Sequence, residues 1–256
     1  MRIALLISGR LKCYEQCLIS LLENTKYDID LFCSINDKED EIYLDPHSEF
    51  YGTNPQNVDY NIARNKLKPW LKGLRIVPYE LPEIFDEDKY PTGYICHFTD
   101  TPHPKPWHAM SMFYNDRKAF EMATEYADNN NFEYDAYLKF RSDIDTNKIP
   151  DIVKTDEYKL FSVVPNCNHW QYGVVRDPPG FDQVKHPWVS CVMDYGNRKS
   201  MDAYTQTHNF CLEMLELFDG RYRIAFEYSL TQNVADKKLP VEFFSQYHLH
   251  YSNRNT

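Results

Sequence analysis

The stretch that decides the fold is Tyr137-Leu138-Lys139-Phe140-Arg141-Ser142-Asp143-Ile144-Asp145. An apolar and aromatic run leads here into two aspartates one residue apart. The pattern predicts a buried strand over 134–145 that carries both carboxylates on one face at the edge of a sheet. Two like charges on one face repel unless a cation lies between them, and Mg²⁺-like ions bind such oxygens together with a substrate phosphate. The alternative is a solvated strand end in an acidic chain.

Other apolar runs predict the rest of a sheet. The run Ile3 to Ile7, the helical spacing within Tyr14 to Asn24 and the run Ile29 to Ile35 form a strand–helix–strand unit. Such a unit predicts parallel strands joined by a right-handed crossover. Similar patterns predict further strands over 74–79, 159–165, 189–195 and 239–244, and helices over 61–71, 108–129 and 199–218. We therefore expect one α/β domain with a mostly parallel mixed central sheet flanked by helices.

Composition limits the class of partner and the compartment. The 256 residues carry a net charge of -10, which disfavours a nucleic-acid ligand. The seven cysteines include no C-x-x-C pair, which indicates free thiols in a reducing compartment. No apolar run approaches the roughly 20 residues of a membrane-spanning helix, and the N-terminal run is too short for a signal peptide. We expect a cytoplasmic protein with no integral membrane segment.

Three polar groups follow predicted strands, namely Ser8-Gly9-Arg10, Asn36-Asp37 and Asp143-Ile144-Asp145. Ligands of open α/β sheets bind at the carboxyl ends of strands, near the point where the strand order reverses. Gly9 would let the backbone approach a nucleotide, and Arg10 would offer a planar fork to a phosphate or a base. Asn36 and Asp37 would hydrogen-bond a base or ribose. The alternative for the first two groups is ordinary turn chemistry.

The quoted run resembles the "K-x-R-S-D" strand of nucleotide-sugar glycosyltransferases with the GT-A fold. The resemblance is closest to the small bacterial and large-DNA-virus enzymes of polysaccharide synthesis. Residues 3–10 are similar to the first strand and nucleotide-binding turn of these enzymes. Two later segments are similar to a "D-x-x-x-x-G-x-x-x-x-M-x-x-Y" element around Gly196 and a "P-E-x-x-L" element around Glu227. The chain departs from both, because the acid before Gly196 is displaced and Phe226 stands where proline is expected.

The resemblance implies a single GT-A-like domain over 1–256, with a nucleotide-binding half of about 1–147 and an acceptor-binding half of about 148–256. The implied enzyme is a hexosyl- or pentosyltransferase. It would move a sugar from a UDP- or GDP-sugar to a hydroxyl of a glycan or similar acceptor. A Mn²⁺ or Mg²⁺ ion would act as the Lewis acid that stabilises the leaving diphosphate.

The resemblance also implies roles for particular residues. Asp145 and a late histidine, His250, would bind the metal, and Asp143 would bind the metal or the donor's ribose or sugar. A carboxylate must take the proton of the acceptor hydroxyl in an inverting transfer, and the candidates are Glu227 and Asp194. The alternative for Glu227 is a helix N-terminal charge that complements the dipole. Arg117 and Arg141 would hold the phosphate or sugar of the donor. The alternative for Arg117 is an ordinary surface residue of its helix.

Two other functions remain open at this point. A non-catalytic relative would bind a nucleotide sugar or carbohydrate without turnover, which the displaced acid before Gly196 allows. A metal-dependent nucleotidyl- or phosphotransferase would use the same carboxylates. No G-x-x-x-x-G-K-[ST] occurs in the sequence, and this counts against phosphate-loop chemistry.

Overall fold

The computed structural model describes residues 1–9, 11, 14–36, 59–80, 82–84, 106–142, 144–145, 149–163, 189–220, 222, 224, 226–244 and 250–251. For 106–108, 144–145 and 250–251, the backbone alone is described. None of the helices within these ranges is both long and apolar enough to span a bilayer.

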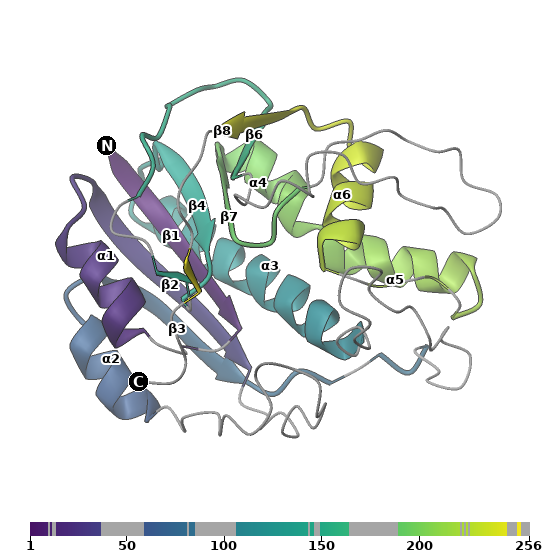
Figure 1. The fold of residues 1–256 in the computed structure, drawn as a ribbon, viewed down its shortest axis with the longest axis horizontal. Coiled ribbons are helices and arrows are strands. Elements are labelled where there is room, and N and C mark those ends of the chain that lie inside the picture. The colour runs from purple at the N-terminus through teal and green to yellow at the C-terminus, as the bar shows by residue number, and fades with distance from the viewer. Residues whose placement is uncertain are drawn as a thin grey trace.

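Seven strands form one central sheet in the order β3-β2-β1-β4-β7-β6-β8 (Figure 1). Four neighbouring strands are parallel: β3 (Leu71–Val77), β2 (Asp28–Asn36), β1 (Arg2–Gly9) and β4 (Ala136–Phe140). The other three are β7 (Met193–Gly196), β6 (Leu160–Val163) and β8 (Val241–Phe244). Strand β7 is antiparallel to β4 and β6, while β8 is parallel to β6. The predicted class, one α/β domain with a mostly parallel mixed sheet, is confirmed.

Helices flank this sheet. A π-helical turn η1 (Glu15–Ile19) and α1 (Ser20–Glu23) connect β1 to β2, and α2 (Tyr60–Leu67) precedes β3. The long α3 (Pro106–Asn129) then returns the chain from the edge of the sheet to β4, beside β1 (Figure 1). Right-handed crossovers place α1 and α2 on one face and α3 on the other. The strand order therefore reverses between β1 and β4, where ligands of such sheets bind.

The first two strands and α3 form the centre of the core. Strand β1 is buried from Ile3 to Ile7, as expected of a parallel strand covered on both faces. Alanines at 119, 123 and 127, spaced by one helical turn, are fully buried and let α3 approach the sheet closely. Gly73 of β3 lies under this helix, and a Cβ there would lie 2.9 Å from Phe32 and 3.3 Å from Met122.

The predicted strand over 134–145 is wrong in its extent. The pairing of β4 with β1 and with β7 stops at Phe140, although β1 itself continues to Gly9 beside β2. Residues Ile144–Asp145 form β5, which pairs with β9 (His250–Tyr251) in a separate two-stranded ribbon. Consequently the two aspartates do not extend one continuous strand of the central sheet.

Several other boundaries differ from the predictions. The helix expected over 61–71 is α2, which ends at Leu67, and the strand expected over 74–79 is β3, which starts at Leu71. The helix expected over 199–218 is divided at Gln206 into α4 (Arg198–Thr205) and α5 (Thr207–Leu217). The strand expected over 189–195 starts only at Met193. Before it, the backbone N–H of Val189 donates to the Thr231 hydroxyl and that of Ser190 to the Ser162 hydroxyl, so neither bonds the backbone of a neighbouring strand. The last helix, α6 (Phe226–Asp236), begins near the predicted point.

Candidate functional site

The carboxyl ends of β1 and β4 meet at the point where the strand order reverses. Gly9 ends β1 with a φ of +81°, in the left-handed region that favours glycine. A Cβ built there has no described atom within 4 Å, so the backbone conformation, and not crowding, requires the glycine. Ser8 beside it is buried. The backbone at the end of β1 therefore favours glycine, and the role of Gly9 toward a nucleotide stays a prediction.

Glu227 and Arg141 come together through Cys191 at the end of β4. Arg141 follows β4 directly, and Glu227 lies in the first turn of α6. The Cys191 thiol donates a hydrogen bond to Glu227 Oε1 at 3.0 Å, and Arg141 Nη1 donates to Cys191 Sγ at 3.8 Å. A carboxylate and a guanidinium from distant parts of the sequence thus lie on either side of one thiol.

Burial keeps the Cys191 thiol protonated. Burial and the negative charge of Glu227 raise the pKa of Cys191 to about 12, against the opposing charges of Arg141 and Lys139. A neutral thiol can donate its proton to the carboxylate, whereas a thiolate would repel it. The Cys191 thiol therefore donates the hydrogen bond that holds Glu227 in place. Cys17, Cys33 and Cys211 are also free and buried.

Asp194, the other predicted base, lies inside the sheet. Its carboxyl oxygens accept hydrogen bonds from Ser162 Oγ at 2.6 Å and from Tyr204 Oη at 3.0 Å. The residue has 0% exposed surface, and burial raises its pKa to about 7. An acceptor hydroxyl has no direct route to an enclosed carboxyl. The contacts therefore favour Glu227 over Asp194 as the predicted base.

A buried charge cluster, formed by Lys139, Asp116 and Asp194, lies behind this site. Lys139 faces Asp194 across the β4–β7 pair, is fully buried, and donates a hydrogen bond from Nζ to the carbonyl oxygen of Cys191. Burial raises the pKa of Asp116, which the Lys139 charge offsets in part. Neither oxygen of this carboxyl has a hydrogen-bond partner among the described residues. The ammonium of Lys139 is therefore the charge that balances two buried carboxyl groups.

Sequence reasoning missed Lys139 and Asp116 as members of a cluster, although both leave a signal. Lys139 interrupts an apolar run that was already identified as a buried strand, and lysine is almost never fully buried unless it is paired. Asp116 lies three residues after Phe113 and four before Phe120, on the apolar face of α3. A charged residue within each apolar pattern points to an internal ion pair.

Asn36 and Arg117 have partners within the protein. The Asn36 amide donates to Ser111 Oγ at 3.0 Å and accepts from the Tyr79 backbone N–H at 3.1 Å, which joins β2 to α3 and to the segment after β3. Arg117 on α3 donates to Glu121 at 2.9 Å and to Asp202 of α4 at 2.6 Å. These contacts explain both residues structurally, and their roles toward a donor stay predictions.

The predicted metal ligands are placed by their backbone alone. Asp145 and His250 are direct partners in the antiparallel β5–β9 pair. Arg10, Asp37 and Asp143 lie outside the described residues. Among the side chains that the structure describes, no group of three or more histidines, cysteines or acids is arranged to hold a metal. The register nevertheless brings two predicted ligands, more than 100 positions apart in the sequence, opposite each other.

The chain resembles a known protein in its fold but not in its sequence. The sequence matches no protein-family model and no curated protein. Its fold is similar to that of mouse xyloside xylosyltransferase 1 in the apo form, with 10% sequence identity and a TM-score of 0.42. The match covers 96% of this chain and 86% of the mouse chain. A likeness at this level does not identify an activity.

Proposed function

We propose that the chain is a metal-dependent glycosyltransferase, which moves a sugar from a UDP- or GDP-sugar to a hydroxyl of a glycan. The observation that carries this proposal is the meeting of Glu227 and Arg141 at the carboxyl end of β4. This end of the sheet lies where the strand order reverses, the usual ligand position in open α/β sheets. The family resemblance of the same strand points to the same chemistry.

Glu227 is the proposed general base. Its Oε1 is held by the Cys191 thiol, while no described residue bonds Oε2, which leaves that oxygen to accept the proton of the acceptor hydroxyl. As the proton moves to Glu227, the hydroxyl oxygen bonds the anomeric carbon, and the bond from that carbon to the donor phosphate oxygen breaks. The nucleoside diphosphate leaves with the electron pair of that bond. General-base catalysis of this kind contributes about 10²- to 10⁴-fold in rate.

Arg141 and the end of β1 are the proposed donor contacts. The Arg141 guanidinium carries the positive charge that a leaving diphosphate requires, and Gly9 allows backbone approach to it. We propose that Arg10, Asp37 and Asp143 complete this donor-binding half, about 1–147. The acceptor would then bind in the second half, about 148–256, from which α6 brings Glu227.

Asp143, Asp145 and His250 are the proposed ligands of Mn²⁺ or Mg²⁺. Carboxylate oxygens suit these ions and imidazole suits several divalent metals. The β5–β9 register supports this set, since opposite residues of an antiparallel pair have Cα atoms about 4.5–5.5 Å apart. When bound, the ion would neutralise charge on the leaving diphosphate.

A panel of sugar nucleotides tests the proposed reaction. The protein is incubated with UDP-, GDP-, CDP- and dTDP-sugars and Mn²⁺, with and without a mixture of oligosaccharide acceptors, and the released nucleotide is identified by chromatography. We expect release of a nucleoside diphosphate from one donor class, faster with acceptor, and abolished by EDTA. Release of a nucleoside monophosphate would instead indicate phosphotransfer. Binding of a sugar nucleotide without any release would indicate a non-catalytic relative.

A further inference from the structure

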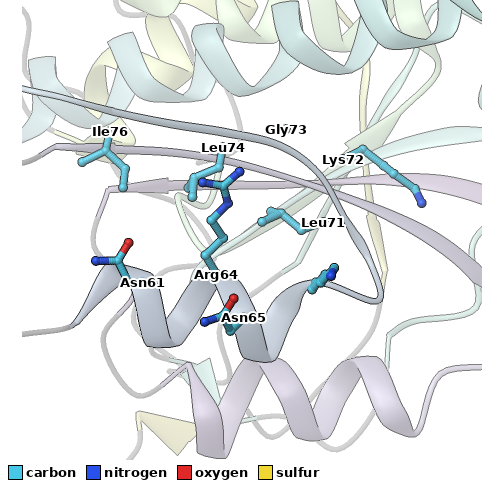
Figure 2. Close-up of a pocket in the computed structure, with 9 residues that line it drawn as sticks. Asn61, Arg64, Asn65, Leu71, Lys72, Gly73, Leu74 and Ile76 are labelled. Carbon is cyan, nitrogen blue, oxygen red and sulfur yellow. The ribbon is translucent and has the colours of Figure 1, made fainter.

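A separate pocket lies at the outer edge of the sheet, between α2 and β3 (Figure 2). Its volume is about 670 Å³, within the range of pockets that bind small ligands. Strands β2 and β1 separate β3 from β4, so this edge pocket is distinct from the proposed transfer site. Nine described residues line it: Asn61, Arg64, Asn65, Lys68, Leu71, Lys72, Gly73, Leu74 and Ile76.

The edge pocket is positively charged. Arg64, Lys68 and Lys72 line it, and its described lining residues include no acid, although the whole chain has a net charge of -10. Arg64 and Lys68 are four residues apart on α2, a spacing at which like charges destabilise a helix. Neither has an ion pair or hydrogen bond with another described residue, whereas Lys66 on the same helix pairs with Glu15 at 2.6 Å.

A bulge in β3 places the third cation. Leu71 pairs with Leu31 and Gly73 pairs with Phe32, so Lys72 is the extra residue on the edge strand. Bulges re-aim side chains at sheet edges. Lys72 lies 3.7 Å from Asp30, but Arg2 already approaches the same carboxylate to 2.7 Å. Tyr134 and Arg2 also bond this carboxylate, on the face of the sheet that α3 covers, so the ammonium of Lys72 is directed away from Arg64. Lys72 therefore lines the edge of the pocket, and the cations directed into it come from α2 and the residue after it.

Hydrogen-bond donors and apolar surface occupy opposite walls of the edge pocket. Asn61, Arg64, Asn65 and Lys68 follow the three- and four-residue spacing that puts them on one face of α2. Figure 2 shows Arg64 reaching from α2 toward Leu74 of β3. On the strand side, the pocket is lined by Leu71, Leu74 and Ile76. A ligand that fits must combine oxyanions, other hydrogen-bonding groups and an apolar face.

We propose that the edge pocket binds an acidic oligosaccharide, whose carboxylates or sulfates contact Arg64 and Lys68. Sugar hydroxyls would bond the amides of Asn61 and Asn65, and the apolar face of a ring would lie on the leucines. No aromatic residue is present among the described lining residues to stack on a base, as sites for single-stranded nucleic acid usually provide. The proposal concerns binding alone and does not depend on the transfer reaction.

Calorimetric titration in the absence of donor tests this site. The probes are tetragalacturonic acid, a heparin-derived tetrasaccharide and neutral maltotetraose. We expect at least one acidic probe to bind, the neutral one not to bind, and the Arg64→Ala/Lys68→Ala double variant to bind at least tenfold more weakly. Alanine favours helix, so α2 is expected to persist in this variant. Lys66→Ala removes a positive charge from the same helix outside the pocket, and its affinity should stay within twofold of wild type.

Several results would overturn the proposal. Unchanged affinity in the folded double variant would show that the probe does not bind in the edge pocket. A loss of affinity in Lys66→Ala as large as in the double variant would indicate unspecific attraction to a positively charged helix. Equal binding of maltotetraose would show that the cations do not contribute. Tighter binding of a single-stranded oligonucleotide than of either acidic probe would assign the pocket to nucleic acid. Because no donor is present, a failed transfer assay leaves these results unaffected.

Discussion

Replacing Lys139 with methionine should destabilise the protein by about 3–5 kcal/mol, the usual cost of leaving a buried charge without its counter-charge. Methionine is similar in size to lysine and fills the same space, so the loss reports charge and not packing. The substitution leaves Asp116 and Asp194 inside the core without the ammonium that lowers the pKa of both carboxyl groups. Chemical denaturation monitored by circular dichroism measures the change.

The loss should be larger at pH 8 than at pH 5. An acid whose folded-state pKa is raised binds its proton more tightly when folded, so folding stability falls as pH rises from the unfolded toward the folded pKa. Burial already raises the pKa of Asp194 to about 7, and removal of Lys139 raises it further. At pH 5 the Asp194 carboxyl of the variant is neutral when folded. At pH 8 the folded protein must either ionise this buried carboxyl or keep its proton bound, and both cost stability.

Two further variants serve as controls for this prediction. Lys139→Met/Asp194→Asn removes one buried carboxylate together with the cation, and should recover part of the lost stability at pH 8. If Lys139→Met does not fold alone, this recovery still tests the cluster. Lys66→Met removes a surface cation and should cost under about 1 kcal/mol, as is usual for an exposed ion pair. A cost of Lys139→Met that is equally small, or independent of pH, would contradict the charge cluster.

Replacing Glu227 with glutamine should lower kcat about 10²- to 10⁴-fold, the usual contribution of a general base. Glutamine has the same shape and can still accept the hydrogen bond of the Cys191 thiol, but its amide does not take a proton at neutral pH. Donor affinity should stay within threefold of wild type, because the proposed donor contacts come from other residues. Initial rates and donor titrations under the conditions of the sugar-nucleotide panel separate the two effects.

Glu216→Gln, on the exposed surface of α5, is the matched control and should leave both kcat and donor affinity unchanged. Asp194→Asn tests the other predicted base. Since its side chain is enclosed by Ser162 and Tyr204, we expect this variant to alter stability while the folded fraction keeps its kcat. Full activity of Glu227→Gln, together with loss in Asp194→Asn, would move the base to Asp194 and require an opening of the sheet.

The sequence predicted the strands and helices whose patterns are complete within a few residues. The apolar run of β1 and the alternating helix and strand after it are local signals, and the structure confirms them. The end of β4 at Phe140 was not predictable in this way. It depends on where the pairing with β1 and β7 stops, which is information from distant parts of the chain.

The residues of the candidate site also divide into those with a local sequence signal and those without one. Gly9 was proposed from its position at the end of an apolar run, which is a local signal, and Arg141 from the family resemblance of the run that contains it. The link from Glu227 through Cys191 to Arg141 joins residues up to 86 positions apart, and no local pattern contains it. The pairing of Asp145 with His250 is equally non-local, and it follows from a ribbon that the sequence did not predict.

Thermal denaturation with nucleotide and metal tests the central claim most directly. UDP or GDP with Mn²⁺ at about 100 times the Kd should stabilise the native protein by about 2.7 kcal/mol, which for a chain of this length raises Tm by roughly 5–10 °C. Asp145→Ala should lose this metal-dependent shift, while the exposed Asp156→Ala keeps it. Absence of a shift with any nucleotide, with or without metal, or an undiminished shift in Asp145→Ala, would contradict a metal-dependent glycosyltransferase built on this aspartate.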